Sequence, residues 1–268
     1  MLTLSSMTLK CTEITQKIEE FISEQVDNAG LYGAVVAVSG GIDSAVTLSL
    51  TARALGPERV RAVTMPERDI TPKRDITDVM QLVTSLNVTC DTVEITPVMD
   101  VMREILPLYD ASRRVEFGNL KARTRMIFSY HYANSLNSMV MGSSNRTEWL
   151  TGYFTKHGDG GVDLMPIADL YKNQVKQLAK YLEVPENIIK KPPSAGFWRG
   201  QTDEGELGIS YDTLDLILYG VDSGMTADEI SEDLKLERAV VQGVFDRVRR
   251  NEHKRRLPLI LRLRKSHS

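Results

Sequence analysis

The hydrophobic pattern of the first half of the chain alternates between two kinds of segment. Short apolar runs rich in β-branched residues predict strands, and amphipathic stretches between them predict helices. A first helix is indicated by Ile14, Ile18, Ile22 and Val26 at helical spacing, with Gly30 as its C-terminal cap. The expected strands are 33–38, 60–65, 90–95 and 138–142, and the expected helices between them are 43–55, 74–86, 97–106 and 117–136. This alternation predicts an α/β fold with a doubly wound, mostly parallel sheet, helices on both faces and ligands at the carboxyl ends of the strands.

From Pro166 onward the pattern becomes helical. The expected helices are 171–182, 185–190, 210–219, 226–234 and 237–251. One stretch between them has too much proline and glycine for a regular element, and we expect it to form a mobile loop at about 192–208. Loops of this length in compact domains are usually functional lids. With no internal repeat in the sequence, we expect residues 1–268 to form a single domain with a helical C-terminal part.

The most specific motif is Ser-Gly-Gly-Ile-Asp-Ser at residues 39–44, called the glycine turn below, between an apolar run and a helical pattern. Backbone N–H groups of such a turn and of the following helix N-terminus form an anion site. We expect glycine at Gly40 and Gly41 because a side chain would block a phosphate or forbid the dihedrals of the turn. Asp43 would repel phosphate unless Mg²⁺ lay between them, which indicates a magnesium-bound nucleotide. The alternative is a solvated turn with a Ser or Asp helix cap.

The composition of the chain argues against several classes of protein. The chain of 268 residues is 42% hydrophobic and 26% charged, as in ordinary globular proteins, and its net charge of −3 gives no case for nucleic-acid binding. Cys11 and Cys90 form no C-x-x-C pair, so neither a disulfide framework nor a zinc site is indicated. No apolar stretch approaches the roughly 20 residues of a membrane span, and the N-terminus lacks the form of a signal peptide. We therefore expect a cytoplasmic protein with no membrane partner.

Two further motifs carry candidate chemistry with an open alternative each. Asn119, Arg123 and Met126 share one face of the helix 117–136, and this face either binds a phosphate or carboxylate or is simply solvated. Glu148 follows the strand 138–142 at the start of a short helix. Its carboxylate either caps that helix or holds a metal together with Asp43.

The glycine-rich stretch 152–166 contains two carboxylates and a lysine, which core packing does not require. Polar residues on such a loop indicate a binding site. The alternative is a disordered surface hairpin. Near the C-terminus, residues 253–256 and 262–265 form two local basic clusters.

The glycine turn resembles the signature of the adenine-nucleotide α hydrolases, the N-type ATP pyrophosphatases that cleave ATP between its α and β phosphates. Further motifs narrow the resemblance to ammonia-dependent NAD synthetases. They are Gly-Asn-Leu-Lys-Ala-Arg-Thr-Arg-Met at 118–126, Gly-Ser-Ser-Asn-Arg-Thr-Glu at 142–148, the stretch 152–166, Asp-Leu-Tyr-Lys at 169–172, Ser-Ala-Gly-Phe-Trp at 194–198 and His-Lys-Arg at 253–255. Two positions depart mildly from that family, which often has threonine at Ser143 and usually leucine at Phe197.

The resemblance implies a C–N ligase that amidates deamido-NAD (nicotinic acid adenine dinucleotide) with ammonia. It would use ATP and Mg²⁺, pass through an acyl-adenylate and release NAD, AMP and pyrophosphate, the last step of NAD biosynthesis. Glutamine-using relatives carry an N-terminal amidase, and here only about 30 residues precede the first strand. We therefore expect no glutamine amidotransferase domain and free ammonia as the donor, and a separate glutaminase subunit stays open. The resemblance also implies a homodimer.

Residue roles follow from the resemblance, position by position. The ATP contacts would be Ser39, Gly40, Gly41, Ser44, Ser143, Lys172 and Ser194. The deamido-NAD contacts would be Asn119, Arg123, Lys156, Asp163, His253 and Lys254. Asp43 and Glu148 would bind Mg²⁺, and Asp159 would hold ammonium and take its proton, so the expected catalytic residues are Asp159, Lys172 and Asp43.

Two alternatives remain from the sequence. The first is the ATP-pyrophosphatase subunit of a GMP synthetase, which shares the glycine turn but acts on a purine nucleotide; the motifs at 118–126 and 152–163 argue against it. The second is a nucleotide-binding module without catalysis. Intact carboxylates at Asp43, Glu148 and Asp159 argue against a module of that kind.

Overall fold

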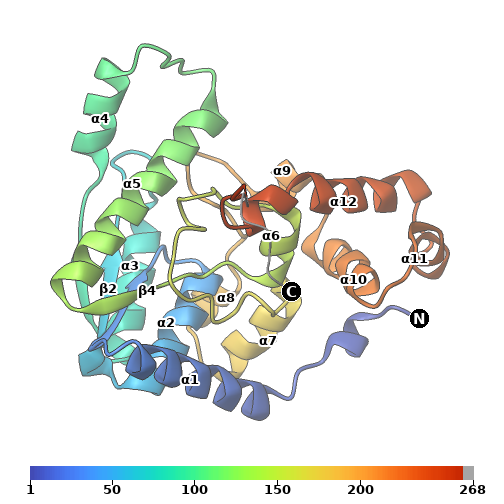
Figure 1. Ribbon diagram of the computed structural model, residues 1–268, viewed down its shortest axis with the longest axis horizontal. Coiled ribbons are helices and arrows are strands. Elements are labelled where there is room, and N and C mark those ends of the chain that lie inside the picture. The colour runs from blue at the N-terminus through green and yellow to red at the C-terminus, as the bar shows by residue number, and fades with distance from the viewer. Residues whose placement is uncertain (262–268) are drawn as a thin grey trace.

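A four-stranded parallel sheet lies between layers of helices in the computed structural model, which describes residues 1–261 (Figure 1). The strands are β1 (Gly33–Ala37), β2 (Val60–Thr64), β3 (Thr89–Thr92) and β4 (Ser138–Met141), in the spatial order β3-β2-β1-β4. Ala34 of β1 lies opposite Val60 of β2 and Met139 of β4. The strand order reverses between β1 and β4, and ligands of open α/β sheets bind beyond the carboxyl ends of the strands at such a reversal.

Helices cover both faces of the sheet, which confirms the doubly wound prediction. On one face, Ala34 and Val36 belong to a core built with α1 (Cys11–Asn28), α2 (Ile42–Leu55), α3 (Lys73–Ser85), α7 (Lys172–Tyr181) and α8 (Glu186–Ile189). Val35 points to the opposite face and packs with α4 (Thr96–Ile105) and α5 (Arg114–Ser135). All strands and helices expected from the periodicity are present. The strand expected at 90–95 is shorter, because β3 is an edge strand and the chain leaves it to enter α4.

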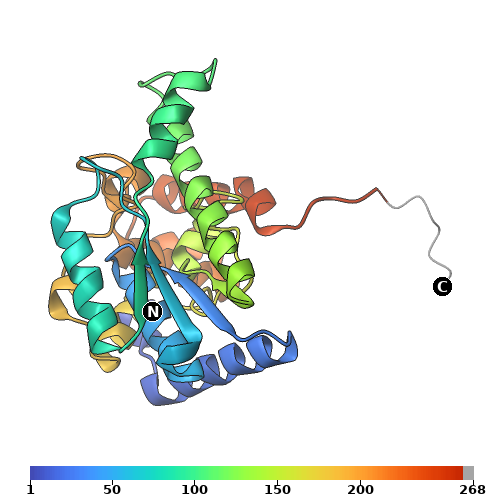
Figure 2. The same ribbon diagram turned by 90° about the vertical axis from the view of Figure 1, so that its left-hand side faces the viewer.

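The C-terminal part is helical, as predicted. A third core is formed by α9 (Asp203–Leu207), α10 (Tyr211–Asp222), α11 (Ala227–Leu234) and α12 (Arg238–Arg250), seen in orange and red in Figure 1. The N-terminal turn η1 (Leu4–Met7) contributes Met7 to it. Smaller elements are η2 (Pro57–Arg59), α6 (Arg146–Thr151) and η3 (Glu252–Arg255), after which the chain extends away from the body (Figure 2). The basic cluster predicted at 262–265 lies outside the described residues.

The end of the first helix confirms the predicted cap. Gly30 has a φ of +66°, and Leu31 N–H donates to the carbonyl of Val26 at 3.2 Å, which closes the last turn of α1. None of the helices within residues 1–261 is long and apolar enough to cross a membrane.

The loop expected at 192–208 is irregular only as far as residue 202, so the prediction is wrong for residues 203–207, which form α9. The Thr202 side chain accepts the Gly205 N–H at 3.3 Å and starts this short helix. We call residues 192–202 the lid segment. They line the same pocket as the glycine turn.

Candidate active site

The glycine turn lies at the carboxyl end of β1 and leads directly into α2. Gly40 has a φ of +80°, and a Cβ atom there would lie 2.7 Å from the carbonyl oxygen of Asp75. Gly41 has an ordinary φ of −89°, and a Cβ atom there would meet only the Ser39 hydroxyl, at 3.3 Å. The backbone reason for glycine therefore applies at Gly40 but not at Gly41, where the other predicted reason, room for a phosphate, stays a prediction.

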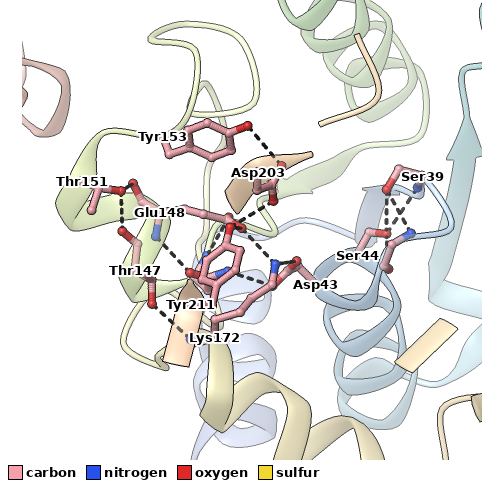
Figure 3. Close-up of polar contacts among 12 residues, drawn as sticks. Ser39, Asp43, Ser44, Thr147, Glu148, Thr151, Tyr153, Lys172, Asp203 and Tyr211 are labelled. Atoms are coloured by element: carbon pink, nitrogen blue, oxygen red, sulfur yellow. Dashed lines mark hydrogen bonds and ion pairs between the residues drawn. The ribbon is translucent and has the colours of Figure 1, made fainter. Parts of the chain in front are cut away.

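The two serines of the turn bind its backbone and each other (Figure 3). Gly41 N–H donates to Ser39 Oγ at 3.2 Å, Ser44 Oγ donates to the Gly41 carbonyl at 3.0 Å, and the two hydroxyl oxygens are 3.3 Å apart. Gly41 is the N-cap of α2, and no side chain in the described part of the chain caps this helix end. The alternative of a Ser or Asp cap is therefore wrong, and N–H groups at the positive end of the helix dipole remain available to an anion.

Replacing Gly40 by alanine is expected to lower the free energy of unfolding by about 1–3 kcal/mol, because it combines a left-handed backbone with a clash against Asp75. Gly41→Ala is the matched control, since its backbone is ordinary and its only close neighbour is the Ser39 hydroxyl. Urea denaturation without nucleotide measures both variants. Equal destabilisation of the two would contradict this account of the turn.

Lys172 forms a buried ion cluster with the two carboxylates predicted to bind magnesium (Figure 3). Its Nζ lies 2.5 Å from Asp43 Oδ2 and 3.1 Å from Glu148 Oε1, and the residue is only 1% exposed. Burial alone would lower the pKa of Lys172, but Asp43 and Glu148 outweigh it and hold this pKa above its ordinary value. The ammonium group is therefore a fixed positive charge beside the glycine turn.

Glu148 fulfils the capping role that the sequence left open, and its role as a metal ligand stays a prediction. With Asn145 it forms a capping box at the start of α6, in which Glu148 N–H donates to Asn145 Oδ1 at 3.0 Å. The carboxylate oxygen Oε1 of Glu148 faces Lys172. Asn145 also donates from Nδ2 to Asp43 Oδ1 at 2.9 Å, so the cap holds both carboxylates in position.

Several polar residues that support this cluster were not singled out from the sequence. Asp203 of α9 accepts hydrogen bonds from the hydroxyls of Tyr211 at 3.0 Å and Tyr153 at 3.1 Å. Buried Asp215 of α10 accepts from Thr147 Oγ1 at 2.5 Å and from Asn173 N–H at 2.8 Å, the neighbours of Glu148 and Lys172. These partners lie far apart in the sequence, so no local pattern connects them.

Lys191, just before the lid segment, is another residue whose role the sequence did not reveal. Its Nζ donates to the Gly40 carbonyl at 2.8 Å and lies 2.8 Å from Asp75 Oδ1, and it also pairs with Asp78. The side chain is nearly buried, with 12% exposed. Lys191 therefore ties the start of the lid segment to the glycine turn and to α3.

A pocket of about 580 Å³ collects one group of the predicted residues between the glycine turn and the lid segment. Its lining includes every residue predicted to contact ATP or Mg²⁺, together with Asp159. These are Ser39, Gly40, Gly41, Asp43, Ser44, Ser143, Glu148, Asp159, Lys172 and Ser194. The residues predicted to contact deamido-NAD lie outside this lining: Asn119, Arg123, Lys156, Asp163, His253 and Lys254.

Most of that second group gathers around the glycine-rich stretch 152–163. Asn119 Oδ1 accepts from Thr155 Oγ1 at 2.6 Å, and Arg123 Nη2 donates to the Lys156 carbonyl at 3.3 Å. Lys156 Nζ in turn donates to the carbonyl of His253 at 3.0 Å. The helix face predicted to be either ligand-binding or solvated is thus partly covered by this stretch, which is packed rather than a disordered hairpin.

The last two residues of the group are held by backbone groups and, for Asp163, also by a tyrosine hydroxyl. Lys254 Nζ donates to the carbonyls of Gly152 at 2.7 Å and Phe154 at 2.9 Å. Asp163 lies at the other end of the stretch, where its Oδ2 accepts the Val140 N–H at 2.8 Å and its Oδ1 accepts the Tyr130 hydroxyl at 3.0 Å. Asp163 is thus placed beside β4.

Asp159 lies between the two groups of predicted residues, because it lines the pocket and also contacts Thr155 in the stretch 152–163. Its Oδ1 accepts the Thr155 N–H at 2.8 Å, and Thr155 in turn contacts Asn119. The residue is open to the pocket, but the protein around its other sides desolvates the carboxylate and raises the pKa of Asp159. A carboxylate with a raised pKa is a better acceptor for a proton than an ordinary aspartate.

The carboxylates of this cluster fit a magnesium ion of the kind that accompanies ATP. Asp43 and Glu148 converge on the Lys172 ammonium, which shows that this position favours positive charge. Residues 1–261 contain no group of three or more His, Cys, Asp or Glu side chains arranged to hold a metal. A pair of carboxylates suits Mg²⁺, which takes its other ligands from phosphates and water.

The parallel sheet, its reversal point and the glycine turn define a nucleotide-binding α/β protein with the fold of the adenine-nucleotide α hydrolases. The family described as NAD synthase matches residues 14–258. The chain belongs to this family, which confirms the resemblance and the ligase class.

Individual relatives support the assignment of the chain to this family. The NH3-dependent NAD+ synthetase of Methanosarcina acetivorans is 47% identical and covers 90% of this chain and 94% of that protein. Among solved structures, the NH3-dependent NAD synthetase of Campylobacter jejuni has a TM-score of 0.80 at 33% identity, covering 95% of this chain and 100% of that chain. The NMN synthetase of Francisella tularensis has a TM-score of 0.83 at 35% identity, covering 95% of this chain and 99% of that chain. Neither the GMP synthetase alternative nor a non-catalytic module is favoured by these relatives.

Proposed function

We propose that this protein uses ATP and ammonia to convert deamido-NAD into NAD, with AMP and pyrophosphate as the other products. The observation that carries the proposal is the Lys172 cluster, which places two carboxylates and an ammonium beside an uncapped helix N-terminus in one pocket. Curated relatives of 42–47% identity with this activity in their names support it. We infer that ammonia is the nitrogen donor from the names of the same relatives.

In the first half-reaction, a carboxylate oxygen of deamido-NAD attacks the α phosphorus of ATP and pyrophosphate leaves. The N–H groups of the glycine turn and the hydroxyls of Ser39 and Ser44 would bind the phosphates. Lys172 would stabilise the negative charge that develops in the transition state. Asp43 and Glu148 would hold Mg²⁺, which supplies charge neutralisation for the triphosphate when bound.

In the second half-reaction, ammonia attacks the acyl carbon and AMP leaves. Ammonium must first lose a proton, and we assign this task to Asp159 because its carboxylate is open to the pocket and its pKa is raised. We place the nicotinate end of deamido-NAD near Asp159 and the rest of the dinucleotide along the stretch 152–163. There it would meet Arg123, Lys156 and the other residues of the second group.

Asp159→Asn is expected to lower NAD formation by about a hundredfold or more, the usual contribution of a general base, while pyrophosphate release continues. The asparagine keeps the Thr155 N–H contact but cannot take a proton. Single-turnover assays that follow pyrophosphate and NAD separately measure the two steps. Equal loss of both half-reactions would remove Asp159 from its assigned role.

The proposal is tested by offering purified protein ATP, Mg²⁺ and ammonium with three acceptors in parallel. They are deamido-NAD, nicotinate mononucleotide and xanthosine monophosphate. Nicotinate mononucleotide is included because one structural relative is an NMN synthetase. The proposal expects deamido-NAD to have the highest kcat/KM and glutamine to be a poor substitute for ammonium; a preference for either other acceptor would contradict it.

The assembly, location and domain organisation remain predictions. We propose a homodimer and a cytoplasmic enzyme with one domain, as expected from the resemblance and the composition. Sedimentation analysis of the purified protein would determine the oligomeric state.

A further inference from the structure

The lid segment contacts α5 through one residue, Phe197. Lys121 Nζ of α5 donates to the Phe197 carbonyl at 2.6 Å. The Phe197 ring packs directly on Gly118, where a Cβ atom would lie 2.9 Å from ring atom Cδ2. The guanidinium of Arg125 lies 6.0 Å from the centre of the same ring. Both the backbone and the side chain of Phe197 therefore contact this helix.

Gly118, Lys121 and Arg125 lie on one face of α5, because spacings of three and four residues bring side chains together on a helix. This face differs from the one formed by Asn119, Arg123 and Met126, which contacts the stretch 152–163. The motif at 118–126 therefore contacts two neighbouring segments, the lid segment and the stretch 152–163, through two faces of one helix. We call Gly118, Lys121 and Arg125 the docking face.

A buried ion network fixes the position of Lys121. Its Nζ lies 2.6 Å from Glu67 Oε2, and Glu67 Oε1 accepts a hydrogen bond from Arg103 Nη2 at 2.6 Å. Lys121 is 4% exposed and Glu67 is 1% exposed, so this charge pair is removed from water. A buried ammonium needs further acceptors, and the Phe197 carbonyl is one of them.

Hydrogen bonds also hold Phe197 within the lid segment and connect the segment to α9. Phe197 N–H donates to Gln201 Oε1 at 2.7 Å, and Gln201 Nε2 donates to Glu206 Oε2 at 3.1 Å. At its other end, Lys191 binds the carbonyl of Gly40 in the glycine turn. The segment therefore spans the pocket between two lysine contacts, one at the glycine turn and one on α5.

We propose that Gly118, Lys121 and Arg125 hold the lid segment closed over the pocket, with Lys121 as a positioning residue that acts through the Phe197 carbonyl. Closure keeps water away from the acyl-adenylate. The protective effect rests on the proposed function, whereas the docking itself does not.

Loss of docking has a defined chemical consequence. Water then attacks the acyl carbon in place of ammonia, AMP leaves, and the carboxylate of deamido-NAD is regenerated. The net reaction is ATP and water to AMP and pyrophosphate. The ratio of AMP to NAD, which is one when every adenylate is amidated, rises above one.

The proposal is tested with Gly118→Ala and Phe197→Ala, which leave the buried charges in place. Gly243→Ala is the matched control, since Gly243 lies within α12 and an added Cβ atom there meets nothing within 4 Å. Lys121→Met tests the hydrogen bond itself and is compared at equal folded fraction, because it leaves Glu67 with one partner fewer. Two measurements are made on each variant: trypsin cleavage after Arg199 of the lid segment, whose side chain is 74% exposed, and the ratio of AMP to NAD.

We expect cleavage after Arg199 to accelerate by at least about fivefold in Gly118→Ala, Phe197→Ala and Lys121→Met, as for the loss of one hydrogen bond or one tight contact, and not in Gly243→Ala. The AMP-to-NAD ratio should rise above one in the same variants only. Unchanged cleavage and an unchanged ratio in folded Gly118→Ala and Phe197→Ala would overturn the proposal. If the wild type forms no NAD, the proposed function fails, and the cleavage rates still decide whether docking occurs.

Discussion

Replacing Lys172 by methionine is expected to lower the free energy of unfolding by about 3–5 kcal/mol, the usual cost of removing one partner of a buried ion pair. Asp43 and Glu148 would then face each other without the ammonium that lies 2.5 Å and 3.1 Å from their oxygens. Adenylation should also fall by about a hundredfold or more, because a charge that stabilises the transition state is lost. Urea denaturation and pyrophosphate release measure the two effects.

The matched control is Lys176→Met, one turn further along α7. Its side chain is 39% exposed and lies 3.8 Å from Asp212, so the change in unfolding free energy should stay within about 0.5 kcal/mol. Mg²⁺ provides a second test. If Asp43 and Glu148 are its ligands, added Mg²⁺ should raise the melting temperature of Lys172→Met more than that of the wild type. An equal response of both proteins would argue against this pair as the metal site.

Asp43→Asn is expected to reduce kcat/KM for pyrophosphate release by about a thousandfold, comparable to the loss of one strong transition-state interaction. The substitution keeps the size of the side chain but removes a negative charge that Lys172 and the proposed Mg²⁺ site share. Asp43 lies within the glycine turn and in the first turn of α2, and α2 contains no other carboxylate that could replace it. Initial rates over a range of Mg²⁺ concentrations measure the effect.

The comparison variant is Asp27→Asn at the end of α1, whose carboxylate is 61% exposed and pairs with Arg59. Its rates should equal those of the wild type. If Asp43→Asn retains near-normal rates at saturating Mg²⁺, the residue neither holds the metal nor stabilises the triphosphate, and adenylation would have to depend on other groups.

The fold and the glycine turn were predictable because their signals are local. The strands carry β-branched apolar runs, and the turn combines a strand end, two glycines and a helix start within a few residues. The α9 helix was not predictable, since it has five residues and depends on the Thr202 cap and on the tyrosines that bind Asp203. Short helices of this kind owe their stability to tertiary contacts rather than to periodicity.

The candidate site could be predicted only in part for the same reason. Asp43 lies in a recognisable motif, but its pairing with Lys172 joins positions 129 residues apart. Lys121 and Lys191 carried no separate signal, because their partners, Phe197 and Gly40, lie 76 and 151 residues away in the sequence. The resemblance to NAD synthetases supplied Lys172 and Asp159; it did not supply the residues that hold the lid segment.

The central claim is that this pocket adenylates a carboxylate, and isotope transfer tests it most directly. Deamido-NAD labelled with ¹⁸O in both carboxylate oxygens is incubated with the protein, ATP, Mg²⁺ and ammonium, and the products are analysed by mass spectrometry. The account predicts one ¹⁸O atom in each AMP, one in the new amide of NAD and none in pyrophosphate, because the attacking oxygen leaves with AMP. AMP without label, or label in pyrophosphate, would contradict it.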